Sequence, residues 1–413
     1  MNSLQLKEPA SIVPPSPRKS APAKKAGGKS AQSHHSKQAA GRERMVKALQ
    51  LPERCPTILG KRAPQPIEHI KIENAIGFAQ IPVGLAGPLT ISGKNQQGTF
   101  FAPLATTEAT LIASCSRGCK AFQARGGIRT AALREGMLRA PVFRFNTVDD
   151  AVAFAAVIPQ YESFFRQVAK KTTRFGKLVS IRPNVIHKEV HVRFSYTCGD
   201  AGGQNMSTIA THAACTAFLK QFSAEHRITD FVLEGQMAGD KKLAILNVDD
   251  PRGVSVMAWG TIPDEVCRKV LGSPAARIHK TLTTGRAGAT RVGMIGDTIN
   301  TSNIVAAMFI ACGQDAASVF EAGWTQLVSD VDEKTGDLTM SVYMPNLPVA
   351  SIGGGTTYST QKEALEMLGC AGKERKWALA ETIAAFALAL DISTMSAMTD
   401  DTFSNSHQKM ARL

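Results

Sequence analysis

The chain has 413 residues, of which 44% are hydrophobic and 20% charged, and a formal net charge of +14. This length supports a large core and more than one domain, and the composition is typical of a globular protein rather than a disordered or fibrous one. The first 50 residues carry ten Lys/Arg and two Glu, and the rest of the chain is only mildly basic. That distribution argues against a nucleic-acid-binding core but allows a pocket for phosphorylated ligands.

The eight cysteines are scattered and form no Cys-x-x-Cys pair, so we expect reduced core thiols in a reducing compartment, the cytoplasm, and no metal site. No apolar run reaches the roughly 18–20 residues that a membrane helix needs, and the first 30 residues have no apolar segment typical of a signal peptide. We therefore expect no membrane span and no nucleic-acid partner.

The beginning of the chain, residues 1–45, is rich in Pro, Ser, Ala and Lys and is predicted to be a disordered basic tail. A solvated tail is the expected role, and docking to a membrane surface or a partner is the alternative. The glycine- and proline-rich stretch 73–89 indicates special turns.

A helix is predicted over residues 103–127, with Glu108 in its first turn and Gly126-Gly127 at its end. A carboxyl group there has two interpretations. The ordinary one is an interaction with the helix dipole. The functional one is a buried acid with a raised pKa.

Residues 141–232 are predicted to be a separate α+β unit. Helices over 148–157 and 161–169 flank Pro159, and the alternating pattern of 188–196 predicts a strand. A glycine-rich turn at 199–203 then opens a helix that runs to about residue 224. Such a turn suits an anion or a dinucleotide, although its spacing is not that of a Gly-x-Gly-x-x-Gly fingerprint.

Three charges, Asp240-Lys241-Lys242, follow two glycines and precede the apolar run 243–248, which is predicted to be a buried strand pairing with 253–261. A lysine at the mouth of such a strand suits a site where an anion forms. The alternative is an ordinary solvated turn. Further on, the apolar helix 304–312 leads to Asp315, either a buried carboxylate or the cap of the next helix.

The last third of the chain contains a predicted hairpin of strands 327–331 and 338–343, the glycine-rich loop 353–356 and a long Ala-rich helix over 375–398. His407 lies near the polar end of the chain. A histidine there is usually solvated or closes a helix.

Together these motifs resemble the catalytic portion of the 3-hydroxy-3-methylglutaryl-coenzyme A (HMG-CoA) reductase family, of the eukaryotic-type class, from about residue 50 to the end. The ordered set is Glu73-Asn74, Pro82-Val83-Gly84, Gly87-Pro88-Leu89, Thr106-Thr107-Glu108, Arg139-Ala140-Pro141, Gly199-Asp200-Ala201, Asp240-Lys241-Lys242, Asn303-Ile304-Val305, Cys312-Gly313-Gln314-Asp315, Gly353-Gly354-Gly355-Thr356 and Ser406-His407. Each motif is weak alone, and the order is specific.

The resemblance implies an α/β fold with a large acyl-CoA-binding domain, from 46–140 and 233–413, and a ferredoxin-like NADP-binding insertion at 141–232. It implies that HMG-CoA is reduced to mevalonate with two hydrides from NADPH, and that a homodimer or homotetramer shares its active sites. The implied catalytic residues are Lys241 for the oxyanion, Glu108 as proton donor, Asp315 between them, and His407 for the coenzyme A thiolate.

The resemblance also implies two sets of binding residues. The substrate set is Glu73, Asn74, Arg139, Asp240, Lys242, Lys280 and Asn303. The NADPH set is Arg174, Asp200, Ala201, Gly202, Asn205, Met206, Gly354, Gly355 and Thr356, in which Arg174 favours the 2′-phosphate of NADPH.

The chain departs from the family pattern within the expected substrate pocket. Glu234 stands where a substrate-binding serine is usual, and Gln236 stands where asparagine is usual. The stretch 295–300 also differs, and three extra residues separate Lys280 from Asn303. Two alternatives therefore stay open: a related reductase acting on a different acyl-CoA or acyl-carrier thioester, and a non-catalytic relative that binds coenzyme A or a partner.

Overall fold

Residues 29–400 are described by a computed structural model, and the chain divides after Gln50 into two compact units. Helix α1 (Lys29–Ala48) belongs to the first unit. The prediction of a disordered tail up to residue 45 is therefore wrong from residue 29 onward, and its earlier part lies outside the described residues. His407 also lies outside them.

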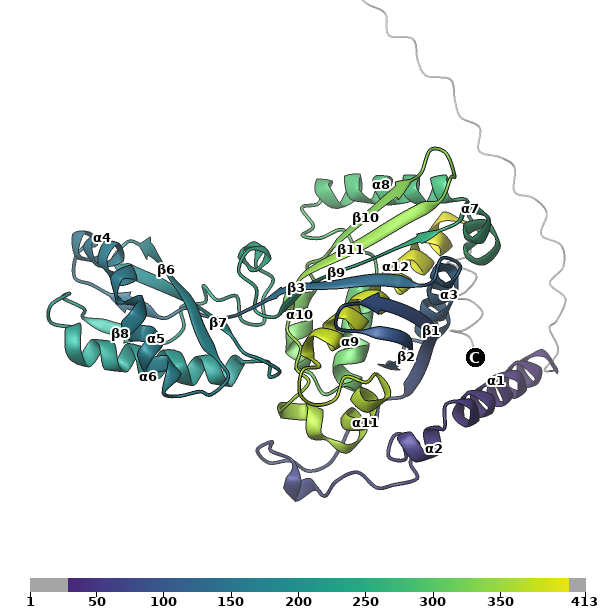
Figure 1. Ribbon diagram of the computed structural model, residues 1–413, viewed down its shortest axis with the longest axis horizontal. Helices are drawn as coiled ribbons and strands as arrows, with labels where there is room; N and C mark the ends of the chain where they lie inside the picture. Colours follow the sequence, from purple (N-terminus) through teal and green to yellow (C-terminus); the bar gives the residue numbers. More distant parts are fainter. Residues whose placement is uncertain (1–28, 401–413) are drawn as a thin grey trace, which may run out of the picture. The chain divides into compact units, whose positions relative to one another are not determined.

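The second unit contains a mixed sheet in the strand order β10-β11-β9-β3-β1-β2 (Figure 1). Its strands are β1 (Val83–Gly93), β2 (Gln97–Ala105), β3 (Ile128–Glu135), β9 (Val254–Ile262), β10 (Gln326–Val331) and β11 (Leu338–Leu347). β1 and β3 are parallel, and the other neighbouring strands are antiparallel. The predicted hairpin of strands near 327–331 and 338–343 is confirmed.

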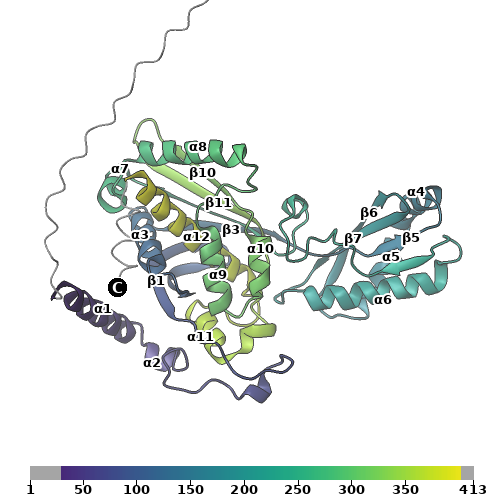
Figure 2. The same cartoon turned by 180° about the vertical axis from the view of Figure 1, so that it is seen from behind.

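Helix α12 (Lys376–Thr399) is the centre of the large core, and α9 (Thr301–Ala311) packs on it (Figure 2). Its sequence is apolar on all sides, which is typical of a helix enclosed by protein. By length and composition this helix could also span a membrane, contrary to the expectation from the sequence. Its most apolar segment, however, is entirely buried inside the protein. Its buried Glu381 accepts hydrogen bonds from the backbone of Gln96 and Ala132.

A second sheet has its own aromatic core, which includes Phe143, Phe154 and Phe218. Its strands are β4 (Met137–Arg139), β5 (Val142–Arg144), β6 (Lys177–Ile186), β7 (Glu189–Thr197) and β8 (Asp230–Val232), and its helices are α4 (Val148–Val157), α5 (Glu162–Lys170) and α6 (Gln204–Phe222). Strand β6 pairs with β7, β7 with β5, and β5 with β8, all antiparallel. This is the ferredoxin-like β-α-β-β-α-β arrangement, which confirms the predicted fold class.

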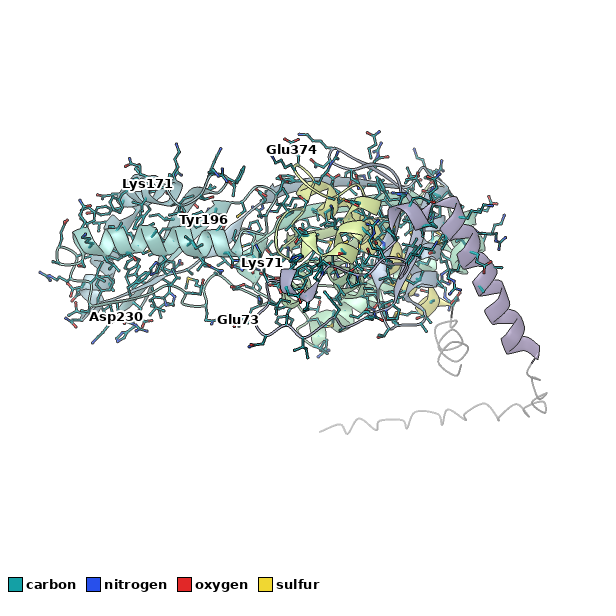
Figure 3. All side chains as sticks on the ribbon, turned by 90° about the horizontal axis from the view of Figure 1, so that it is seen from below. Lys71, Glu73, Lys171, Tyr196, Asp230 and Glu374 are labelled. Atoms are coloured by element: carbon teal, nitrogen blue, oxygen red, sulfur yellow. The ribbon has the colours of Figure 1, made fainter. Side chains whose placement is uncertain are left out.

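Helix α6 lies along this small sheet, and Figure 3 shows the labelled Tyr196 of β7 at the helix. The Tyr196 hydroxyl is 2.8 Å from Oγ1 of Thr211 on α6, so the buried phenol has a polar partner. The remaining α-helices are α2 (Leu51–Arg54), α3 (Leu111–Gln123), α7 (Asp264–Val266), α8 (Ala275–Arg291), α10 (Val319–Ala322) and α11 (Ser359–Met367), with short 3₁₀ turns that include η3 (Ile245–Val248), η5 (Ala316–Ser318) and η6 (Gly354–Thr357).

Two local predictions are wrong. Residues 103–105 belong to β2, and α3 begins only at Leu111, so Glu108 precedes the helix rather than lying in its first turn. The apolar run 243–248 is not a buried strand but contains η3, with Ile245 69% exposed. It does not pair with β9, because β3 and β11 occupy both edges of that strand.

Candidate active site

An ion pair between Lys241 and Asp315 lies beside the end of α9. The Lys241 ammonium is 3.0 Å from Oδ2 of Asp315, and the side chains are 46% and 37% exposed. Oδ1 of Asp315 accepts the backbone N–H of Ala317 and so caps η5, as one of its two interpretations predicted. The alternative of a buried carboxylate is wrong. The pair is open to solvent, so a ligand can reach the ammonium.

Backbone turns bring these two residues together. Lys241 has a positive φ of 55°, which is uncommon for a residue other than glycine. Gly313 also has a positive φ, and a Cβ atom there would lie 2.3 Å from the carbonyl oxygen of Gly355. The 353–356 loop therefore packs directly against the turn before Asp315, and only glycine fits at that contact.

Arg139 joins the loop that carries Lys241 to the small sheet. Its Nη1 atom donates to Oδ2 of Asp240 at 2.9 Å, and its Nε atom donates to Oγ1 of Thr208 at 2.8 Å. The third arm donates to the carbonyl oxygen of Gln204. In contrast, Lys242 is exposed, and its amine has no ion pair within the described part of the chain.

Glu234 also lies beside Arg139, near the same Nη1 atom that donates to Asp240. Its Oε2 atom accepts the N–H of Ala140 and is 3.9 Å from Nη1 of Arg139, while Oε1 is buried without a hydrogen-bond partner in the described structure. Burial raises the pKa of this carboxyl, against the opposing effects of the Ala140 N–H and the Arg139 charge. A carboxyl group therefore occupies space next to the guanidinium expected to bind substrate.

Glu108 lies at the opposite end of α9 from Asp315. It is exposed, contrary to the functional interpretation of a buried acid, and its Oε2 atom accepts a hydrogen bond from Nδ2 of Asn303 at 3.1 Å. The same amide group contacts Oδ1 of Asn300 at 3.0 Å. Asn300 is held in turn by Asp391 of α12, whose Oδ1 accepts its backbone N–H at 2.7 Å.

Helix α9 separates these two groups of residues. It has 11 residues, so at a rise of about 1.5 Å per residue its ends are roughly 16 Å apart. Glu108 is bound at its beginning, and the Lys241–Asp315 pair lies beyond its end. Within one described chain, Lys241 and Asp315 meet, but Glu108 contacts neither of them.

The other predicted substrate residues are spread over the surface. Lys280 is exposed on α8, and Glu73 and Asn74 are exposed in the segment before β1, where Figure 3 labels Glu73. Within the described residues, these three side chains form no hydrogen bond or ion pair with the groups above. The structure of this chain alone does not bring these three side chains to Lys241.

The predicted cofactor residues lie in four places. Arg174 is exposed, with its guanidinium 5.9 Å from the centre of the Phe175 ring. Asp200 accepts the N–H of Glu374, and the carbonyl of Ala201 accepts the buried ammonium of Lys376. The others lie at the beginning of α6 (Gly202, Asn205, Met206) and in the glycine-rich turn η6 (Gly354, Gly355, Thr356).

Sequence reasoning missed a basic cavity of about 510 Å³ along α3. Its charged lining residues are Arg117, Lys120 and Lys269, and no carboxylate lines it. The charges at positions 117 and 120 are one helical turn apart, and that spacing was the available signal. Burial lowers the pKa of Arg117, whose guanidinium donates to Ser393.

Comparison with known proteins gives the same family at several levels. The family model described as hydroxymethylglutaryl-coenzyme A reductase matches residues 39–412. The chain is 37% identical over 347 residues to the 3-hydroxy-3-methylglutaryl-coenzyme A reductase of Haloferax volcanii, covering 83% of this chain and 85% of that one. It is also 37% identical over 343 residues to that of Methanothermobacter thermautotrophicus, with the same coverage.

The fold is also similar to that of a solved structure, the class II reductase of Streptococcus pneumoniae described as bound to NADPH. The TM-score is 0.67 at 18% identity, covering 87% of this chain and 96% of that one. The two cores, each built on its own sheet, define an α/β protein. The chain belongs to the HMG-CoA reductase family.

Proposed function

We propose that this chain reduces HMG-CoA to mevalonate and coenzyme A with two hydrides from NADPH. The observation that carries the proposal is the accessible Lys241–Asp315 pair, on a loop anchored by Arg139, in a chain that belongs to this family. The test is to follow NADPH absorbance with HMG-CoA and then with other acyl-CoA thioesters. Turnover with HMG-CoA supports the proposal, and turnover with another thioester alone overturns it.

Lys241 has the chemistry to stabilise negative charge on the substrate's carbonyl oxygen as the carbon becomes tetrahedral. Its ammonium is fixed by Asp315 rather than left mobile, and fixed donors are worth more than solvent dipoles. Glu108 supplies the proton to the alkoxide, and His407 protonates the departing coenzyme A thiolate. The roles of Glu108 and His407 are inferred from the sequence motifs that they share with the family.

The beginning of α6 fits the anionic part of NADPH. Gly203 precedes the helix in a left-handed conformation with no side-chain cap, so the first N–H groups of a 19-residue helix remain free to bind an anion. Arg174 is exposed with no ion pair in the described chain and is suited to the 2′-phosphate. NADPH supplies the hydride in both reductions, and the small domain, residues 141–232, holds it.

The basic cavity on α3 suits the phosphate groups of coenzyme A. Arg117 and Lys120 lie on the helix that follows Glu108 by three residues, and Lys269 faces the same cavity. Along α3, at a rise of about 1.5 Å per residue, Arg117 and Lys120 lie about 9 and 14 Å from the first helical residue, Leu111. The acyl end and the nucleotide end of one thioester thus have separate contacts on a single element.

We further propose that a second copy of the chain completes the active site. Glu108 and Lys241 serve one carbonyl in the proposed reaction but lie at opposite ends of α9. The segment before β1 exposes Ile72 by 60% and Ile76 fully, which is typical of a surface covered by a partner. A homodimer or homotetramer places the Glu108 of one copy at the Lys241–Asp315 pair of another.

Mixing two inactive variants tests shared sites. Glu108→Gln and Lys241→Ala are each expected to be inactive, but a mixed dimer contains one site with both native residues. Random exchange in a two-fold dimer therefore restores about a quarter of the native sites. Activity that stays at the level of the separate variants, after exchange is verified by mass, would show that each chain builds its site alone.

Glu234 supports a second candidate, a reductase for a different acyl thioester. It lies 3.9 Å from Arg139, where it competes with a substrate carboxylate. Such an enzyme would prefer a thioester without the distal carboxylate. Comparing kcat/KM for HMG-CoA with that for an uncharged acyl-CoA decides between the two.

A further inference from the structure

Arg252 is a fully buried cation at the junction of the two cores, and every arm of its side chain has a partner. Its Nη2 atom donates to Oδ1 of Asp240 at 2.5 Å, and its Nη1 atom donates to the carbonyl oxygen of Leu138 at 2.8 Å. Its Nε atom donates to Oε2 of Glu321 at 2.9 Å, in a pair with no exposed side-chain surface.

Each of these three partners is close in sequence to a residue of the proposed active site. Leu138 precedes Arg139, and Asp240 precedes Lys241. Glu321 lies on α10, six residues after Asp315. One guanidinium therefore connects β4, which carries Arg139, the loop that carries Lys241, and α10, which follows Asp315 in the chain.

The carboxylate of Asp240 is held from both sides. Oδ1 accepts from Arg252 and Oδ2 accepts from Arg139, which fixes the plane of the carboxylate as well as its position. The next residue, Lys241, has a positive φ, a conformation that persists in a non-glycine residue when its surroundings hold it. The two arginines supply that restraint immediately before the reactive amine.

Stability alone is a poor explanation for this arrangement. A buried ion pair is often no more stabilising than apolar residues of the same size, because both charges lose their hydration. Arg252 pairs with the equally buried Glu321 through Nε alone, and its Nη2 atom reaches out to Asp240, which is 32% exposed in the loop that carries Lys241. Packing does not explain the contact between Arg252 and Asp240, and this is the contact that reaches the proposed active site.

The geometry points to Arg252 as a positioning residue that fixes Lys241 relative to Arg139 through Asp240. This inference rests on the proposed reductase function. A displacement of about 1 Å at a reacting group lowers a rate by about 100-fold. Arg252→Lys keeps the charge but not the three directed bonds, so we expect kcat to fall by about that factor while the Kd of NADPH stays within about threefold.

A double-mutant cycle distinguishes positioning from a general structural role. If Arg252 acts through Asp240, then Arg252→Lys combined with Asp240→Asn is no slower than the slower single variant, because the same contact is lost in each. If the fold losses in kcat of the two single variants multiply in the double variant, the inference is overturned. Native kcat in Arg252→Lys would also overturn it.

Glu381→Gln is the matched control, since it disrupts a buried hydrogen-bonded carboxylate that holds Gln96 and Ala132. Its kcat is expected to stay native.

Trypsin cleavage after Lys241 and Lys242 gives a readout that needs no activity. Cleavage there is expected to be at least about tenfold faster in Arg252→Lys than in the native chain or in Glu381→Gln, because the loop has lost its anchor. Equal cleavage in all three would also overturn the inference. A native chain that is inactive with every thioester, together with faster cleavage in Arg252→Lys, would refute the reductase proposal while keeping the anchor.

Discussion

The ammonium of Lys241 lies 3.0 Å from Oδ2 of Asp315, although the two residues are 74 positions apart in the sequence, and the pair lies beside the end of α9. The pair is half exposed, so its contribution to folding stability is small. Its accessible ammonium is instead available to an anionic ligand or to a developing oxyanion. A function rather than a fold therefore explains why the loop holds a lysine in a left-handed conformation.

Replacing this lysine should remove catalysis without unfolding the protein. We expect Lys241→Ala to lower kcat for HMG-CoA reduction by at least about 100-fold, because loss of one fixed donor to an oxyanion has that effect. NADPH oxidation measures the rate, and circular dichroism checks the fold. Lys334→Ala removes an exposed lysine from the β10–β11 turn and is the control, with native kcat. A Lys241→Ala enzyme with native kcat would contradict the proposed role.

Strong local patterns predicted many elements, including the β10–β11 hairpin and α12. They failed where tertiary pairing decides the outcome. The run 243–248 has the composition of a buried strand, but β9 already has a partner on each edge, and the run folds into η3 with Ile245 exposed. Sequence also cannot show that Arg252 bonds to Asp240 and Glu321, because that requires three segments to meet.

The proposed site illustrates the same limit. Motif order placed Glu108, Lys241 and Asp315 in one family, but only coordinates reveal that α9 separates the first from the other two. The distance between Glu108 and the Lys241–Asp315 pair follows from the length of α9 and from the elements at its two ends. A sequence pattern that names residue roles does not state which chain supplies each one, and the mixing experiment addresses that question.

Arg174 should set the preference between the two nicotinamide cofactors. Its guanidinium is exposed and is suited to a phosphate through paired, charge-assisted hydrogen bonds. We expect Arg174→Ala to lower the ratio of kcat/KM for NADPH over NADH by at least about tenfold, chiefly through KM for NADPH. Lys220→Ala removes an exposed charge at the opposite end of α6 and should keep the native ratio. An unchanged ratio in Arg174→Ala would remove this residue from the cofactor site.

Glu234 should make substrate binding depend on pH. Burial raises the pKa of its carboxyl group, so the neutral form persists above the usual range for glutamate. As pH rises through that pKa, the carboxylate forms and repels the carboxylate of HMG-CoA, and KM should increase by about tenfold.

Two substitutions test this assignment. Glu234→Ser and Glu234→Gln should both give a lower KM and remove its rise with pH. Glu333→Gln changes an exposed carboxyl in the β10–β11 turn and should keep the native profile. If the Ser and Gln variants retain the native dependence of KM on pH, another group causes it.

Asp391 should make folding stability fall as pH rises from about 4 to 6. Burial raises its pKa from 3.8 to about 6, although it accepts hydrogen bonds from Asn300, Ile299 and Thr301. Between those values the folded chain keeps a proton that the unfolded chain has lost, so stability present below pH 4 is lost as pH rises through 6. A shift of about two pKa units corresponds to about 3 kcal/mol at most.

Asp391→Asn removes this titration and isolates its effect. The variant cannot replace both carboxylate oxygens, so it should be less stable than the native chain at pH 4. The difference in unfolding free energy between the two chains should be smaller at pH 7 than at pH 4 by about 2–3 kcal/mol. Only the native chain loses the stability that protonated Asp391 contributes. Urea unfolding at the two pH values measures it, with Asp332→Asn in the exposed β10–β11 turn as the control. A difference that grows with pH would mean that the folded protein favours the Asp391 carboxylate.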